Sequence, residues 1–125
     1  MKKSRLSSAL FAGMMAAAVA AMAGTPAVVG DWEGALETGH GSLKVVIHLA
    51  QSEEQNLKGT LDSPDQGVTG IVVSAAKYRE SGLHLEIERI GASFDGRMNK
   101  ANSEMTGEWR QGSASLPLTL KRVTK

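Results

Sequence analysis

Cysteine is absent from this sequence of 125 residues, so the chain offers neither a disulfide, nor a lipoprotein attachment site, nor a cysteine nucleophile. Aromatic residues are scarce, at 4% of the chain. Stability must therefore come from packing, and the core must consist mainly of Leu, Val and Ile side chains. After the first 23 residues the chain has no long hydrophobic run, and no segment has the pattern of a long amphipathic helix.

The one extended apolar stretch is at the N-terminus. The chain begins "MKKSRL", continues with an Ala-rich run and reaches "AMAG", in which Ala21 and Ala23 have the spacing that signal peptidase prefers. A membrane anchor is the alternative, but the run is short and weakly hydrophobic, and no basic cluster follows it. We predict a helical signal peptide over residues 1–23 and a single domain over residues 24–125.

Removal of this segment would change the charge balance. It leaves 102 residues with 11 basic and 13 acidic side chains, a formal charge of −2. No basic excess remains for nucleic acid or an anionic membrane surface. The prediction is a bacterial periplasmic or secreted protein with no cofactor, no nucleic-acid partner and no membrane association after signal cleavage.

Beyond residue 30, apolar and polar residues alternate with the period of β-strands, as in "LKVVIHL" and "LHLEI". Turn residues recur every eight to twelve positions, a spacing typical of an antiparallel meander. The sequence predicts an all-β fold, a small antiparallel up-and-down β-barrel of about eight strands that is lipocalin-like. The expected strands are 31–37, 43–50, 56–62, 69–79 (with a bulge allowed), 83–89, 92–99, 104–110 and 115–122.

Four of these strands place a glycine between two large apolar residues on one strand face. Mid-strand glycines indicate either sharp strand coiling or room inside the barrel for an apolar ligand, and the pattern leaves both interpretations open. Trp32, in "GDW", also matches the Gly-x-Trp of a lipocalin first strand, where the Trp packs the closed end. The predicted interior residues are Trp32, Gly34, Gly59, Phe94, Gly96, Gly107 and Trp109.

The connections separate into two ends in an up-and-down meander. One end receives charged, ordinary turns, and the other receives the Gly-rich "TGHGS", "SPDQG", "RIGA" and "QGSAS". "SPDQG" suits a tight turn, but rigid scaffolds also display binding residues on such loops. The candidate binding residues at this end are Asp62, Ser63, Asp65, Gln66, Gln111 and His40.

Catalytic and metal-binding patterns are missing. His48 and His84 are predicted to face solvent, and His84, Glu86 and Glu88 share one strand face without a spacing that guarantees zinc ligation. "GASFDG" lacks the second glycine of a nucleophile elbow, because Asp95 occupies that position. We therefore predict no enzyme activity and no metal site.

The segment from Gly30 to Arg122 resembles a known type of domain, most specifically in "TLDSPDQG" and "WRQGSASLPLTL". It is similar to the β-rich N-terminal accessory domain that precedes the α/β-hydrolase domain of bacterial secreted esterases and peptidase-like hydrolases. In that family the catalytic residues lie in the hydrolase domain, and none corresponds to a position of this sequence, which ends at Lys125. The resemblance implies an accessory domain that occurs alone.

Three functions follow as hypotheses. The first is an exported, non-catalytic interaction module whose Gly-rich loop end contacts a partner protein, such as a hydrolase, or a polar ligand. The second is a carrier of a small apolar ligand in the barrel interior. The third is an accessory subunit of a secreted hydrolase.

Overall fold

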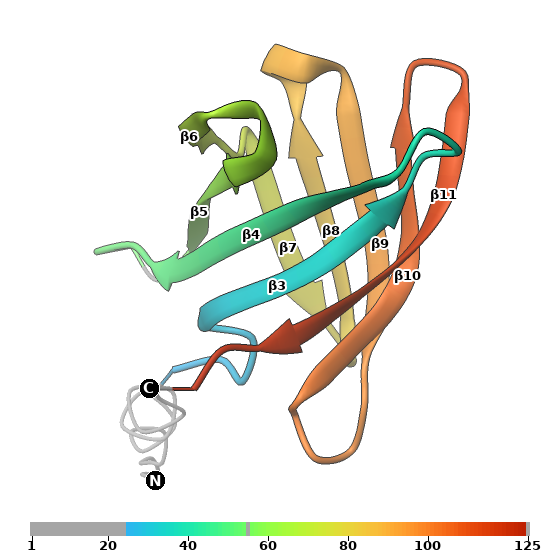
Figure 1. Ribbon diagram of the computed structural model, residues 1–125. Helices are drawn as coiled ribbons and strands as arrows, with labels where there is room; N and C mark the ends of the chain where they lie inside the picture. Colours follow the sequence, from blue (N-terminus) through green and yellow to red (C-terminus); the bar gives the residue numbers. More distant parts are fainter. Residues whose placement is uncertain (1–24, 55, 125) are drawn as a thin grey trace, which may run out of the picture.

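The computed structural model describes residues 25–54 and 56–124, so the predicted signal peptide lies outside the described residues. The described chain is all-β, as the alternation predicts, and its regular structure consists of nine strands and two short 3₁₀ turns (Figure 1). The strands are β3 Gly30–Glu37, β4 Ser42–Gln51, β5 Leu57–Ser63, β6 Val68–Val72, β7 Ala75–Arg79, β8 Gly82–Ile87, β9 Ala92–Met98, β10 Glu104–Gln111 and β11 Ala114–Arg122; the turns are η2 Pro64–Gln66 and η3 Glu88–Ile90. None of the described residues belongs to a helix that is long and apolar enough to cross a membrane.

All nine strands belong to one antiparallel sheet, in the order β6-β5-β4-β3-β11-β10-β9-β8-β7. The first and last strands, β3 and β11, are neighbours in the middle of the sheet, and β6 and β7 form its edges. The sheet curls into a half-barrel, in which β3 and β4 cross in front of β7, β8 and β9 (Figure 1). The curl brings β5 against β7. The apolar faces of both halves therefore meet in one core.

The predicted strand 69–79 is wrong in one respect, because it divides into β6 and β7 and the sheet has nine strands instead of eight. The two residues between β6 and β7, Val73 and Ser74, form backbone hydrogen bonds with different strands. Val73 N–H donates to the Gly59 carbonyl at 2.9 Å, and Ser74 N–H donates to the Glu86 carbonyl at 2.7 Å. The chain thus exchanges β5 for β8 as its partner at this point, and such an exchange interrupts a single strand.

The core follows the predicted alternation. Val45, Ile47 and Leu49 of β4 are buried, as are Leu83 and Leu85 of β8, because successive side chains of a strand point to opposite faces. The remaining buried apolar side chains come from β3, β5, β6, β8, β9, β10 and β11 and from two positions outside the strands, Val28 and Val73. They are Val28, Trp32, Leu36, Leu61, Ile71, Val73, Ile87, Ala92, Phe94, Met98, Met105, Trp109, Leu118 and Leu120.

Three of the mid-strand glycines lie where a neighbouring strand comes unusually close. A Cβ on Gly59 would be 2.7 Å from the carbonyl oxygen of His48, and a Cβ on Gly34 or Gly107 would overlap a carbonyl oxygen of the adjacent strand. The space beside Gly96 is taken by the ring of Phe94. These contacts favour close strand packing over an open cavity at the four glycines.

Candidate functional site

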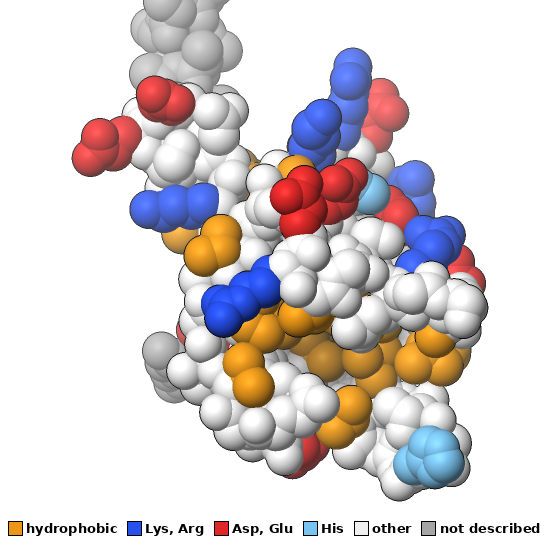
Figure 2. All heavy atoms as spheres, turned by 90° about the horizontal axis from the view of Figure 1, so that it is seen from above, with side chains coloured by type: hydrophobic (Ala, Val, Ile, Leu, Met, Phe, Trp, Pro, Cys, Tyr) orange, Lys and Arg blue, Asp and Glu red, His pale blue; other side chains and the backbone are white. Residues whose placement is uncertain are grey.

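An apolar pocket of about 520 Å³ opens at the Gly-rich loop end of the half-barrel. The connections β3–β4, β5–β6, β8–β9 and β10–β11 surround it at the top of Figure 1. Figure 2 looks onto this end and shows hydrophobic side chains gathered in a hollow between polar loops. Its volume is in the range of small-molecule sites. Its lining is Leu36, Leu43, Val45, Leu61, Ser63, Gln66, Val68, Ile71, Arg89, Ile90, Trp109 and Gln111.

Three of the predicted binding residues belong to this pocket. Ser63 is buried, and its hydroxyl donates to Oε1 of Gln66 at 2.7 Å. Gln111 accepts a hydrogen bond from Nε1 of Trp109 at 3.1 Å and donates from Nε2 to the carbonyl of Ile90, also at 3.1 Å. The two glutamines therefore hold fixed positions on the wall.

Asp65 and Gly67 instead support the turn itself. η2 ends at Gly67, whose φ of 69° is left-handed and whose N–H donates to the Pro64 carbonyl at 3.0 Å. The carboxylate of Asp65 accepts from the Lys44 N–H of β4 at 2.8 Å, which ties the loop to the sheet. Neither residue lines the pocket. The "SPDQG" segment thus serves as a turn and also supplies part of the pocket wall.

Of the other predicted site residues, His40 is exposed in the β3–β4 connection and lies outside the pocket lining. Trp32 and Phe94 are fully buried, and Trp109 is buried at the pocket floor. Trp32 lies at the opposite end of the half-barrel, where its Nε1 donates to the Val28 carbonyl at 2.9 Å. The two tryptophans thus mark the two ends of one core.

Asp62 belongs to a cluster on the outer face of the sheet. His48 places Nδ1 2.8 Å from Asp31 and Nε2 2.9 Å from Asp62, so its imidazole joins β3, β4 and β5. The hydrogen bond to Asp31, followed by the one to Asp62, raises the pKa of His48 above its ordinary value. The pKa of Asp62 is lowered, first by the N–H of Gly70 and then by His48. Both ring nitrogens of His48 are therefore occupied by contacts that hold β3, β4 and β5 together.

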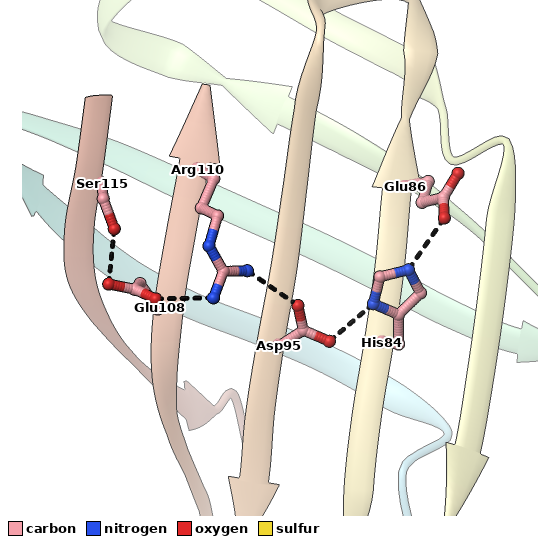
Figure 3. A network of polar contacts seen from close by, with 6 residues as sticks. All are labelled: His84, Glu86, Asp95, Glu108, Arg110 and Ser115. Carbon is pink, nitrogen blue, oxygen red and sulfur yellow. Dashed lines mark hydrogen bonds and ion pairs between the residues drawn. The ribbon is translucent and has the colours of Figure 1, made fainter. Parts of the chain in front are cut away.

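A second cluster occupies the other half of the sheet (Figure 3). His84 of β8 lies between Asp95, at 2.5 Å from Nδ1, and Glu86, at 2.9 Å from Nε2. The hydrogen bond to Glu86, followed by the one to Asp95, raises the pKa of His84. The side chain is 37% exposed, so His84 faces outward as predicted, but it is held by two partners.

The cluster continues across β10 to β11. Arg110 donates from Nη1 to Asp95 at 3.0 Å and from Nη2 to Glu108 at 2.7 Å, and Ser115 donates to Glu108 (Figure 3). Burial alone would raise the pKa of Asp95, but hydrogen bonds from His84 and Arg110 lower it. Opposite charges thus join β8, β9 and β10 on the outside of the core, and the hydrogen bond from Ser115 adds β11.

A further hollow, of about 540 Å³, lies on the outer face of β3 and β11. Seven of its ten lining residues, the predicted Asp65 among them, have polar or charged side chains, and an ion pair joins Lys44 to Glu33 at 3.3 Å. This is a solvated outer groove, and the apolar pocket at the loop end is the better candidate site. Within the described residues, no group of three or more His, Asp or Glu side chains could hold a metal ion.

Most of the pocket wall was not predicted as a site. The aliphatic residues were expected only as core, and Arg89 lies in the "RIGA" bend, which was assigned to the correct end without being singled out. The available indication was the position of Arg89, a long basic side chain within a loop end that is otherwise poor in them. Strand periodicity cannot show which apolar residues border an opening.

The sequence was also compared with known proteins. It matches no protein-family model, and no curated protein is significantly similar to it.

Proposed function

We propose that this protein is an exported, non-catalytic binding module that takes the apolar part of a small ligand into the pocket at its Gly-rich loop end. The observation that carries the proposal is the pocket of about 520 Å³ with a mainly apolar lining, into which Ser63, Gln66 and Gln111 converge. Pockets of this size and character, with a few fixed polar groups, are typical ligand sites. Export is inferred from the N-terminal sequence.

The finer architecture supports the same proposal. We infer that the curled sheet works as a small up-and-down, lipocalin-like barrel, open at the pocket and closed at the end that contains Trp32. The pairing of β3 with β11 and the contact of β5 with β7 support this inference. A barrel of about this size holds one small ligand when its interior is not completely filled.

The histidines support a non-catalytic role. His48 and His84 each hold a carboxylate at both ring nitrogens, so neither presents a free nitrogen as a general base to a serine hydroxyl. Both also lie on the outer face and outside the pocket lining. The pocket itself supplies binding groups and no nucleophile–base pair.

The decisive test compares two valines of the same strand. Val68 lines the pocket, whereas Val72, 65% exposed, does not. We expect Val68→Glu to weaken binding of the neutral apolar dye N-phenyl-1-naphthylamine by about tenfold or more, because it places a charge at an apolar opening. Val72→Glu introduces the same charge on the same strand and should leave binding unchanged. Both variants should unfold within about 1 kcal/mol of the parent protein in urea, since both sites are partly exposed.

Dye fluorescence measures the affinity, and a change in tryptophan emission on binding reports occupation of the pocket, because Trp109 lines it and Trp32 does not. Native mass spectrometry of the protein purified after export would identify a ligand retained from the cell. Absence of dye binding to the unchanged protein, or equal losses in the two variants, would contradict the proposal.

Docking to a hydrolase or another exported protein is the second candidate, and it rests on the unlike loop ends and on the sequence resemblance. A partner held by the Gly-rich loop end through polar contacts should be lost with Asp65→Ala, because Asp65 is exposed on that loop. Dye binding should persist in this variant, since Asp65 does not line the pocket.

A further inference from the structure

The charge of the pocket wall narrows the class of ligand. Eight of the lining residues are apolar, three are neutral and polar, and one, Arg89, is charged. No carboxylate belongs to the lining. A basic side chain borders the apolar hollow in Figure 2. The pocket therefore combines an apolar interior with a single positive charge at its wall.

Arg89 lies on an anchored segment. η3 ends at Gly91, whose φ of 64° is left-handed and whose N–H donates to the Glu88 carbonyl at 3.1 Å. The Glu88 N–H donates to the Ser74 hydroxyl at 3.0 Å, and the Ile90 carbonyl accepts from Gln111 of β10. Arg89 is thus presented by a turn that is held on both sides.

The guanidinium of Arg89 has no hydrogen-bonded or ionic partner within residues 25–54 and 56–124. Arg97, Arg110 and Arg122 have partners, and Arg79, which does not line the pocket, has none among these residues. On the same pocket wall, Gln66 accepts from Ser63 through Oε1, and none of the described groups accepts from its NH₂ group. The unpaired groups of these two side chains, the guanidinium and the amide NH₂, are both donors. A ligand group that matches them is an acceptor with negative charge.

We propose that the pocket binds a single-chain amphiphile with a carboxylate head group, a fatty-acid anion. This inference rests on the proposed function and specifies its ligand. The hydrocarbon chain occupies the apolar wall, and the carboxylate pairs with Arg89 and accepts from the amide of Gln66. The planar guanidinium suits a carboxylate, because it can donate two parallel hydrogen bonds.

The test compares decanoate with 1-decanol, which share a chain and differ in head-group charge. Binding to the exported, purified protein is followed by displacement of N-phenyl-1-naphthylamine. We expect decanoate to bind about fivefold more tightly than decanol at low salt, the effect of one ion pair at a partly exposed site. The difference should shrink in about 1 M salt, where charges are screened over a few ångströms.

Arg89→Gln should remove this preference by lowering the affinity for decanoate to about that for decanol. Arg79→Gln is the matched control. The side chain of Arg79 likewise has no partner among the described residues, and Arg79 is the last residue of β7, which contributes nothing to the pocket lining. Equal binding of the two ligands, a preference that survives Arg89→Gln, or an equal effect of Arg79→Gln would overturn the inference and leave the proposed function standing. If decanoate, decanol and the dye all fail to bind, the result contradicts the proposed function itself.

Discussion

Gly107 faces Gly96 across the ladder between β9 and β10, and the Cα of Gly96 lies 2.5 Å from where a Cβ of Gly107 would be. The same Cβ would overlap the Asp95 carbonyl oxygen. Because the obstacles are backbone atoms, they cannot move as a flexible side chain would. A glycine is therefore required at position 107 because the backbones of β9 and β10 approach each other so closely.

Gly107→Ala should destabilise the protein by about 2–3 kcal/mol, since overpacking against backbone forces the strands apart. Gly82→Ala is the control, because a Cβ on Gly82 would meet its nearest neighbour, the Arg79 carbonyl oxygen, at an ordinary 3.4 Å. Urea unfolding measures both. A loss at Gly107 no larger than at Gly82 would contradict the close-approach interpretation.

At the scale of elements, the end of β11 is tied to the segment that precedes β3. Arg122 donates to the carbonyl of Val29 at 2.9 Å and also to that of Ala27, and its guanidinium lies 4.3 Å from the centroid of the Trp32 ring. Few β3–β11 residues pair in register, namely Lys121–Glu33 and Arg122–Trp32. This contact therefore reinforces the junction between the first and last strands.

Arg122→Lys should cost about 1–2 kcal/mol, because an ammonium keeps the charge but loses the planar stacking and the forked donors. Arg97→Lys is the matched control, since the Arg97 side chain makes a single hydrogen bond among the described residues, 3.0 Å long, to the Glu80 carbonyl on the surface. Thermal unfolding compares the two variants, and amide exchange at residues 27–29 localises the effect. Equal decreases in Tm for the two variants would show that Arg122 stabilises the protein no more than a surface arginine does.

For the molecule as a whole, the two outer clusters make stability depend on pH. The pKa values of His48 and His84 are raised in the folded state, so their contribution is complete below the ordinary histidine value of 6.5 and is lost as the pH rises through the folded pKa values. The pKa values of Asp62 and Asp95 are lowered, so their contribution is lost in acid. Stability should be greatest in the mildly acidic range between these limits.

We expect a Tm that is a few degrees higher at about pH 6 than at about pH 9, a modest effect because the side chains are partly exposed and solvent screens them. The double variant His48→Gln, His84→Gln should flatten this slope. Scanning calorimetry across the pH series measures it. His40→Gln, in an exposed loop, is the control, and an equally flattened slope there would contradict the assignment.

Strand alternation, the all-β class and the sorting of the connections into two ends were predictable, because each depends on neighbours in the chain. The division of 69–79 into two strands was not, since it depends on which strands offer hydrogen bonds to Val73 and Ser74. Likewise Asp62 was expected at the binding end but pairs with His48, a consequence of strand register.

The sequence by itself determined the pattern of buried and exposed positions, because a strand turns alternate side chains to opposite faces whatever its partners are. The tertiary structure decided the site. Residues from β3, β4, β5, η2, β6, η3 and β10 form the pocket, and only the curl of the sheet brings them to one opening. It also left Arg89 without a partner among the residues that the structure describes, which no local pattern predicts, because ion pairs depend on contacts between distant segments.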